Sequence, residues 1–248
     1  MISNQTDFVG IAFDPMTMTM TEAWLSERAP EAPFAFVITP NVDHVVKLDA
    51  APPDAEIRKA YAAAALRLCD SRIVAKLARM RGVDLPVVPG SDLTGHLVTR
   101  IARPGDRICL IGGDAAMLGD LRVLRPDLDI VQHVPPMGML RKPEAMAEAT
   151  AFVRDAKARF TLLAVAMPQQ EILALRVAQA GGAVGVGLCI GASLDFLTGR
   201  KARAPLWMQK ASLEWLHRLL SEPGRLWRRY LIEGPRIFVL TMRWRKPS

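Results

Sequence analysis

One carboxylate lies where a long apolar segment gives way to polar residues, a position that suits a catalytic base. Asp70 follows the alanine-rich run 54–68 (DAEIRKAYAAAALRL), within the sequence LCDS. A carboxylate at an apolar border can have a raised pKa and can then accept a proton from a substrate. An aspartate that only caps the next segment would occupy the same place, so the spacing leaves both roles open.

Polar side chains also follow a short apolar run near residue 40. Thr39 and Asn41 flank Pro40 at the end of the run 34–39 (FAFVIT), which we expect to be a buried strand that stops at the proline. In open α/β sheets, ligand-binding residues gather at the carboxyl ends of the strands. Thr39 and Asn41 are therefore candidates to bind a sugar hydroxyl, although an Asx turn would use the same side chains.

The sequence MPQQE at 167–171 places two amides and an acid at the start of an expected helix. Proline suits the first turn of a helix, and the segment follows an expected strand, so its polar groups should face the ligand cleft. Pro168, Gln170 and Glu171 are therefore candidate substrate contacts. Ordinary helix-start chemistry explains the pattern equally well.

Glycines follow two further expected strands. Gly112 and Gly113, within LIGGD, form a turn from strand to helix in which bare backbone amides could face a phosphate. The full dinucleotide fingerprint is missing, so these two residues are also compatible with a plain turn. Gly191 ends the expected strand at 184–189 and is a third glycine candidate at the same edge of the sheet.

The order of expected elements indicates the fold. Before Pro104 the patterns predict helices at 17–28, 54–68 and 93–102, the last capped by Ser91 or Asp92. After it they predict strands at 107–111, 128–131, 161–166 and 184–189, alternating with helices at 115–124, 143–158 and 168–180. Alternation with short connections is typical of a parallel sheet wound by right-handed crossovers. We expect an α/β protein with a Rossmann-like parallel sheet flanked by helices, a smaller N-terminal α/β lobe and a helical, basic C-terminal appendage.

The chain divides into three expected units. Residues 1–103 form the N-terminal lobe with the candidate base, 104–199 the Rossmann-like half that binds a nucleotide, and 200–248 the appendage. The appendage holds twelve Lys and Arg against three Glu, a net charge of +9, whereas the whole chain carries +7. The first 199 residues therefore sum to −2. A near-neutral body with a strongly cationic end suggests an anionic partner at that end.

The appendage also combines cations with amphipathic aromatic residues. On a helical wheel of residues 225–231, Arg228 and Arg229 lie on one side, and Trp227 and Tyr230 lie on the other. Such a two-faced helix suits a membrane interface, and packing against the body or in a homo-oligomer is the alternative. Arg203, Arg218 and Arg225 are further appendage cations that could bind an anionic substrate.

Composition narrows the class of protein further. Half of the 248 residues are hydrophobic and 23% are charged, which excludes a disordered chain. The three cysteines and four histidines are scattered, so neither a disulfide framework nor a paired metal site is indicated. The first residues, MISNQTDF, lack the pattern of a signal peptide. We therefore expect a protein on the cytoplasmic side, either soluble or peripheral to the inner membrane.

Several motifs together resemble the WecG/TagA/CpsF family of bacterial glycosyltransferases, from about Phe8 to Tyr230. The motifs are TPNVDH from Thr39, Asp70, GSDL from Gly90, IGG from Ile111, PQQE from Pro168, and RAPLW, LEWLHR and EPGR in the appendage. Each motif is weak alone, but their order and spacing are specific.

The resemblance implies an inverting transfer from a UDP-sugar to a sugar on undecaprenyl diphosphate at the cytoplasmic face of the inner membrane. It implies synthesis of exopolysaccharide, capsule or a teichoic-acid-type polymer. By the same resemblance Asp70 would be the base, Thr39 and Asn41 would line the sugar pocket, Gln170 would contact the donor, and the appendage arginines would face diphosphate. The family often has an arginine where this chain has Val87. Arg203, Arg218 and Arg225 are the candidates to replace it.

The resemblance further implies a reaction without metal or cofactor. Asp127 and Asp129 match the Asp-x-Asp pattern of metal-dependent glycosyltransferases, but they lie between a helix and a strand, at the wrong edge of the sheet. A basic nucleic-acid-binding protein and a non-catalytic scaffold of a polysaccharide assembly complex are the alternatives. The cations are paired with tryptophans instead of forming a stripe along a groove, so nucleic acid is not the expected partner. The sequence does not indicate which sugar is moved.

Overall fold

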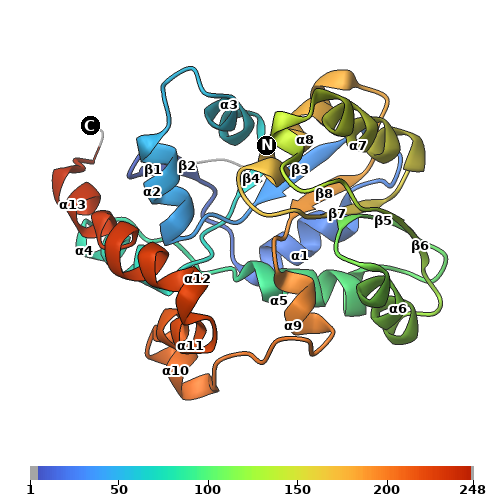
Figure 1. Cartoon of the computed structure of the whole chain (residues 1–248). Helices are drawn as coiled ribbons and strands as arrows, with labels where there is room; N and C mark the ends of the chain where they lie inside the picture. Colours follow the sequence, from blue (N-terminus) through green and yellow to red (C-terminus); the bar gives the residue numbers. More distant parts are fainter. Residues whose placement is uncertain (1–4, 247–248) are drawn as a thin grey trace.

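The computed structural model describes residues 5–246, which fold around one six-stranded parallel sheet (Figure 1). The strands lie in the order β4-β3-β8-β7-β5-β6. Their bounds are β3 (Ala35–Ile38), β4 (Leu66–Arg67), β5 (Arg107–Gly112), β6 (Asp129–His133), β7 (Phe160–Ala164) and β8 (Val186–Cys189). The α/β class and the flanked parallel sheet are therefore as the sequence predicts.

Helices cover both faces of the sheet because its strands bury side chains in both directions. In β5, Cys109 and Ile111 enter one core and Ile108 and Leu110 enter the other, as the period of two requires. The first core is covered by α2 (Val42–Ala50), α3 (Glu56–Ala63), α7 (Pro143–Ala156) and α8 (Gln169–Ala180). The second is covered by α1 (Met18–Glu27), α5 (Gly90–His96), the π-helical η1 (Leu97–Ile101), α6 (Ala115–Leu124) and α9 (Ser193–Leu197).

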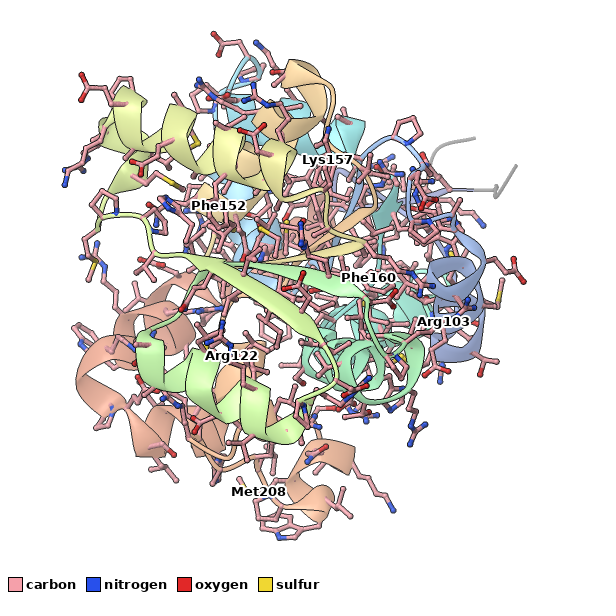
Figure 2. All side chains as sticks on the ribbon, turned by 90° about the vertical axis from the view of Figure 1, so that its right-hand side faces the viewer. Arg103, Arg122, Phe152, Lys157, Phe160 and Met208 are labelled. Atoms are coloured by element: carbon pink, nitrogen blue, oxygen red, sulfur yellow. The ribbon has the colours of Figure 1, made fainter. Side chains whose placement is uncertain are left out.

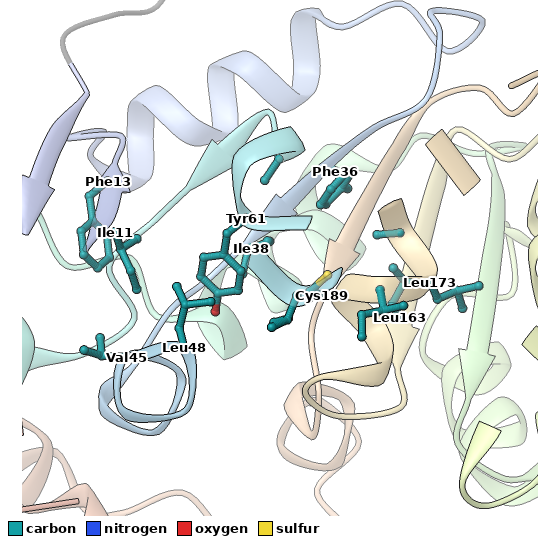
Figure 3. Close-up of a cluster of buried hydrophobic side chains, with 14 of the residues drawn as sticks. Ile11, Phe13, Phe36, Ile38, Val45, Leu48, Tyr61, Leu163, Leu173 and Cys189 are labelled. Atoms are coloured by element: carbon teal, nitrogen blue, oxygen red, sulfur yellow. The ribbon is translucent and has the colours of Figure 1, made fainter. Parts of the chain in front are cut away.

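The two layers can be followed in the side-chain views. In Figure 2, Phe152 of α7 and Arg122 of α6 lie on opposite sides of the sheet, and Met208 marks the appendage. Figure 3 shows the first core, in which Tyr61 of α3 lies among Ile38, Leu48 and Cys189. This core also reaches the antiparallel hairpin of β1 (Thr6–Phe8) and β2 (Ile11–Phe13).

Two expected helices differ from the structure. The alanine-rich run does not stay helical to residue 68: α3 ends at Ala63, and Leu66 and Arg67 pair with β3 as the edge strand β4. Burial of Leu66 in the sheet outweighs the local helix propensity. The other helix begins at Gly90 instead of Leu93, and neither Ser91 nor Asp92 caps it, because Pro89 takes the N-cap position.

The sheet contains strands from both of the first two expected units. β3 and β4 precede residue 104, yet β3 pairs with β8, which is the last strand along the chain and lies in the middle of the sheet. A division at residue 103 therefore does not separate two sheets. The three-unit division stays a prediction about function.

The appendage consists of short helices that return to the body. They are α10 (Leu206–Lys210), α11 (Glu214–Ser221), α12 (Pro223–Trp227), the π-helical η3 (Arg228–Glu233) and α13 (Arg236–Arg243). α13 packs against α2 and α4 (Arg72–Met80) and buries Ile237 and Thr241. Beyond α13, Trp244 contacts Phe8 at 5.1 Å between ring centroids and donates a 2.7 Å hydrogen bond to Asp7. No helix within residues 5–246 has the length and apolar character required to cross a bilayer.

Candidate active site

A large cavity lies between the carboxyl edge of the sheet and the appendage. Its volume is about 1110 Å³, and its walls come from the loops after β3, β4, β7 and β8 and from α11, α12, η3 and α13. The adjacent strands β3 and β8 lead into α2 and α9, which cover opposite faces of the sheet. Open α/β sheets bind their ligands in a crevice outside the carboxyl ends of the strands. The cavity therefore lies at the edge of the sheet where ligands are expected.

Asp70 lies on this cavity wall, directly after β4. Its Oδ1 accepts a 3.0 Å hydrogen bond from the Gly90 N–H, and its own N–H donates to the Pro40 carbonyl at 2.9 Å. Burial raises the pKa of Asp70 to about 6, while the Gly90 N–H, Arg218 and His44 act in the opposite direction. A carboxylate with this pKa is largely ionised at neutral pH and is still basic enough to accept a proton.

Gly90 is needed for this arrangement because the chain passes close to Thr39. A Cβ at position 90 would lie 2.7 Å from Thr39 Oγ1, a distance that real Cβ contacts do not reach. Thr39 and Asp70 both line the cavity. The short helix start at Gly90 thus holds the carboxylate and the hydroxyl side by side.

Asn41 forms the N-cap of α2, so the Asx interpretation of this residue is confirmed. Its Oδ1 accepts from the Asp43 N–H at 3.0 Å and lies 2.9 Å from His44 Nδ1. Asn41 and His44 also line the cavity. The cap therefore places two polar side chains at the carboxyl end of β3, and capping does not remove them from the site.

Gln170 and Gly191 meet at the carboxyl ends of β7 and β8. Gln170 is 3% exposed, accepts a 2.9 Å hydrogen bond from the Gly191 N–H and lines the cavity together with Gly191. Glu171 is 0% exposed and is not part of the cavity wall. Its Oε1 accepts from Gln170 Nε2 at 2.8 Å and lies 3.6 Å from His44 Nε2. Glu171 is therefore buried outside the cavity wall.

The opposite wall of the cavity carries the cations of the appendage. Arg218 extends from α11 and lies 5.0 Å from the Phe196 ring centroid, and Arg225 pairs with Glu222 at 2.5 Å. Lys201 pairs with the other Glu222 oxygen at 3.0 Å. The neighbouring Arg225 and Lys201 lower the pKa of Glu222 to about 2, so this carboxylate stays ionised. Arg218 and Arg225 are exposed within the wall and can face an anion.

Arg229 connects the appendage to the body across the cavity. Its Nη2 lies 3.2 Å from Asp43 Oδ2, and Lys47 contacts the same oxygen at 2.9 Å. Arg228 is exposed and lies outside the cavity wall, whereas Arg229 and Tyr230 line it. The expected helical wheel does not apply, because the helix changes from α12 to the π-helical η3 at Arg228. Arg228 therefore faces away from the cavity, whereas Arg229 faces into it.

Some predicted site residues lie outside the cavity wall. Gly112 and Gly113 form the turn before α6, where a Cβ on Gly112 would lie 2.8 Å from the Ala164 carbonyl oxygen. Arg203 pairs with Asp92 instead of lining the cavity. Other predicted residues outside the wall are Pro168, Glu171, Trp227 and Arg228. Their roles as direct substrate or membrane contacts stay predictions.

Several wall residues were not among the sequence candidates. They include His44 and Lys47 of α2, Arg72 of α4, Phe196 of α9, and Glu214 and Trp215 of α11. A search for paired histidine ligands does not find His44, which functions with Asn41 three residues earlier. The spacing Asn-x-x-His directly after Pro40 was the available signal.

The cavity thus has the carboxylate of Asp70 and the amides of Asn41 and Gln170 on the body side, together with Lys47 and Arg72. The appendage side contributes Arg218, Arg225 and Arg229, together with Glu214 and Glu222. This arrangement can deprotonate a hydroxyl near Asp70 and can hold a charged leaving group near Arg218 and Arg225. Within residues 5–246, no three His, Cys, Asp or Glu side chains are grouped so as to hold a metal ion.

A family model described as the glycosyl transferase WecG/TagA/CpsF family matches residues 6–248. The match covers nearly the whole chain and confirms the resemblance that the motifs indicate. The protein is therefore a glycosyltransferase, whose substrates are a sugar donor and an acceptor.

Proposed function

We propose that this chain, which belongs to the glycosyl transferase WecG/TagA/CpsF family, transfers a sugar from a UDP-sugar to a polyprenyl-diphosphate-linked sugar, with inversion and without a metal ion. The product would be an intermediate of a cell-surface polysaccharide, and the enzyme would work on the cytoplasmic face of the membrane. The observation that carries the proposal is the position of Asp70, opposite Arg218 and Arg225 in one cavity.

In the proposed reaction, Asp70 accepts the proton of the acceptor hydroxyl. The acceptor oxygen attacks the anomeric carbon from the side opposite UDP, and UDP leaves with the electrons of the broken C–O bond. One carboxylate is sufficient because the leaving diphosphate needs no proton, unlike the leaving group in glycoside hydrolysis. The pKa of about 6 supports this role, because Asp70 is ionised at neutral pH.

The leaving diphosphate needs positive charge, and the appendage is its proposed source. Arg218 and Arg225 are exposed within the wall, and Lys201 lies beside them. Fixed cations aimed at developing charge are the usual means of stabilising such a transition state. Position 87 is a valine in this chain, so the body offers no arginine there.

The surface of the appendage supports contact with a membrane. Trp207 and Ile232 are 65% and 58% exposed, and Arg228, Arg236 and Arg243 are exposed near other apolar side chains. Exposed apolar residues beside arginines suit an anionic lipid surface, where each arginine contributes about 1 kcal/mol. A membrane-bound acceptor would then reach the cavity from the side that the appendage covers.

The test is release of UDP from a panel of UDP-sugars, with and without a synthetic polyprenyl-diphosphate-linked sugar. We expect release with one donor and only when the acceptor is present. A thermal-shift panel of the same donors identifies which sugar stabilises the protein. Binding and release with a different nucleotide, or no release with any donor, would overturn the proposal.

A further inference from the structure

The cavity extends along the carboxyl edge of the sheet, so its two ends are bounded by different elements. At one end, α13 packs against α2 and α4, and η3 packs against α2 (Figure 1). We call this the α13 end, and its wall includes Lys47, Arg72, Ile73, Leu231, Ile237 and Phe238. The other end, the α11 end, lies at the loops after β7 and β8 and is bounded by α9, α11 and α12. The cavity volume of about 1110 Å³ exceeds the roughly 300–1,000 Å³ of a usual ligand pocket, so two substrates can bind side by side.

The six lysine and arginine side chains of the wall differ in whether an acid neutralises them. Four of them are paired, two at each end: Lys47 and Arg229 with Asp43, and Lys201 and Arg225 with Glu222. The other two, Arg72 and Arg218, have no carboxylate partner within residues 5–246. Arg218 lies 5.0 Å from the Phe196 ring centroid and lowers the pKa of Asp70, so its charge acts on the base. Arg72 is exposed in the wall, and its charge is available to an anionic ligand.

Arg72 begins α4 and lies two positions after the candidate base. Two residues of extended chain span at most about 7 Å, so the backbone at Arg72 stays near that of Asp70. In the proposed acceptor, the hydroxyl that gives its proton to Asp70 belongs to a sugar attached directly to a diphosphate. That diphosphate is therefore one sugar ring away from the base. Arg72 is a cation of the body at a suitable distance to meet it.

Apolar side chains line the same end of the cavity. They are Ile73 of α4, Leu231 of η3, and Ile237 and Phe238 of α13. Leu231 and Phe238 line the wall and are still 52% and 51% exposed, so the cavity opens to the surface beside them. Further exposed apolar side chains follow along η3 and α13, namely Ile232, Val239 and Met242. A hydrocarbon chain that leaves the cavity at this opening would contact an apolar surface.

We propose that the α13 end is the acceptor site, in which Arg72 binds the diphosphate of an isoprenoid-linked sugar and Ile73 and Phe238 contact the first isoprene units. The inference rests on the proposed function, because it takes the class of acceptor from it. An arginine suits this role, since its planar donors can bind a phosphate through two hydrogen bonds. Arg72 would thus recognise the acceptor, while Arg218 and Arg225 stabilise the leaving UDP.

The first test is binding of farnesyl diphosphate, an isoprenoid diphosphate that carries no sugar and needs no donor. Isothermal titration calorimetry compares it with UDP. Arg72→Ala should weaken farnesyl diphosphate about tenfold, because a hydrogen bond to a charged group is lost, and should leave UDP unchanged. Phe238→Ala should weaken farnesyl diphosphate about fivefold through lost apolar contact. The inference is overturned if either variant keeps the wild-type affinity for farnesyl diphosphate, or if Arg72→Ala weakens UDP to the same extent.

The second test compares two acceptors that carry the same sugar, one on an alkyl diphosphate and one on a neutral alkyl chain. Arg72→Ala should raise KM for the diphosphate acceptor about tenfold and leave KM for the neutral acceptor and for the donor unchanged. Because the acceptors differ only in the diphosphate, the comparison isolates its contact with Arg72. An equal loss with both acceptors, or a higher KM for the donor, would overturn the inference.

The matched control is Arg79→Ala. Arg79 lies on the same helix as Arg72, pairs with Asp84 at 3.5 Å and is outside the cavity wall. This control should bind farnesyl diphosphate as the wild-type protein does. If it loses as much affinity as Arg72→Ala, the effect is one of net charge and the inference is overturned. If Arg72→Ala does not fold, as its melting curve would show, Arg72→Gln keeps more of the side chain and decides by the same comparisons.

The two tests also separate this inference from the proposed function. If farnesyl diphosphate binds through Arg72 but no UDP-sugar is used, the proposed function fails and the site for an isoprenoid diphosphate stands. If transfer occurs and Arg72→Ala matches the wild-type protein with both acceptors, the proposed function stands and the inference is overturned.

Discussion

The body up to residue 199 and the appendage after it line the same cavity but carry net charges of opposite sign. The body carries a net charge of −2 and contributes Asp70, Asn41 and Gln170, each held by hydrogen bonds to neighbouring backbone or side chains. The appendage carries +9 and contributes Arg218 and Arg225 from helices of eight and five residues. The comparison teaches that the base is fixed by the sheet, whereas the cations depend on how the appendage docks.

Removing residues 200–248 is the strongest test of this comparison. We expect no transfer above background, even to a soluble short-chain acceptor, because the deletion removes every appendage cation from the cavity wall. The measurement is UDP release, and circular dichroism of the truncated body is the control for folding. Full-rate transfer by a folded body would show that the appendage serves only as an anchor.

Replacing the base tests the body alone. Asp70→Asn should lower kcat by about 10²–10⁴-fold, because general-base catalysis contributes that much. Steady-state kinetics with saturating donor and acceptor give the effect. Turnover near the wild-type value in this variant would remove Asp70 from the mechanism.

Replacing single cations tests the appendage alone. Arg218→Ala and Arg225→Ala should each lower kcat between about tenfold and a hundredfold, since each removes one charge from an open wall with others nearby. Arg243→Ala, an exposed change on α13 outside the cavity wall, is the matched control and should keep its rate with a soluble acceptor. Equal effects of all three variants would indicate a general loss of basic charge instead of a specific contact.

The burial of ionised Asp70 also lowers the free energy of unfolding, and Asp70→Asn should remove this destabilisation. The pKa of Asp70 is raised from 3.8 to about 6 in the folded state, so the folded protein loses stability as pH rises from about 4 to 6. Asp70→Asn should therefore stabilise the protein by about 1–3 kcal/mol at pH 7.5 and have little effect at pH 4. Urea unfolding at both pH values measures this. A destabilised variant at pH 7.5 would mean that the hydrogen bond from Gly90 outweighs the burial.

The smallest expected effect is on membrane binding. Arg228→Gln should weaken binding to vesicles that contain phosphatidylglycerol about fivefold, which corresponds to about 1 kcal/mol for one arginine. Vesicle sedimentation at low and high salt measures it, and transfer to a soluble acceptor should be unchanged. Arg229→Gln should instead impair transfer, because Arg229 pairs with Asp43 inside the cavity. Similar effects of Arg228→Gln and Arg229→Gln on vesicle binding and on transfer would contradict the different positions of these two arginines.

The sequence predicts five of the six strands of the sheet, because these strands are compact apolar runs, of which 34–39 and 107–111 end directly before a proline or a glycine. The sequence also predicts that Thr39, Asn41, Asp70, Gln170 and Gly191 lie near one another, because parallel strands present their carboxyl ends at one edge of the sheet. All five residues line the cavity. This rule alone does not exclude Gly112 and Gly113, which follow a strand of the same sheet. Their turn is filled by neighbouring atoms and lies outside the cavity wall.

Tertiary contacts explain what the sequence does not predict. Leu66 and Arg67 continue an alanine-rich helical pattern and become a strand only because β3 offers an edge. A helical wheel with 3.6 residues per turn places Arg229 on the same side as Arg228, but the π-helical turn of η3 and the carboxylate of Asp43 direct Arg229 into the cavity. Neither the π-helical turn of η3 nor the ion pair with Asp43 of α2 can be predicted from the sequence of the appendage alone.

The contact of Trp244 with the N-terminal hairpin has a mechanical consequence. The appendage is joined to the body covalently at residue 199 and again through Trp244, which contacts Phe8, Asp7 and Arg81. Helices of five to eight residues are marginal alone, but a segment anchored at both ends loses less entropy on ordering. Trp244 thus adds a support at the far end of the appendage to those that α13 and Arg229 provide. A change at Asp7 would weaken this support and loosen the arginines over the substrate without touching them.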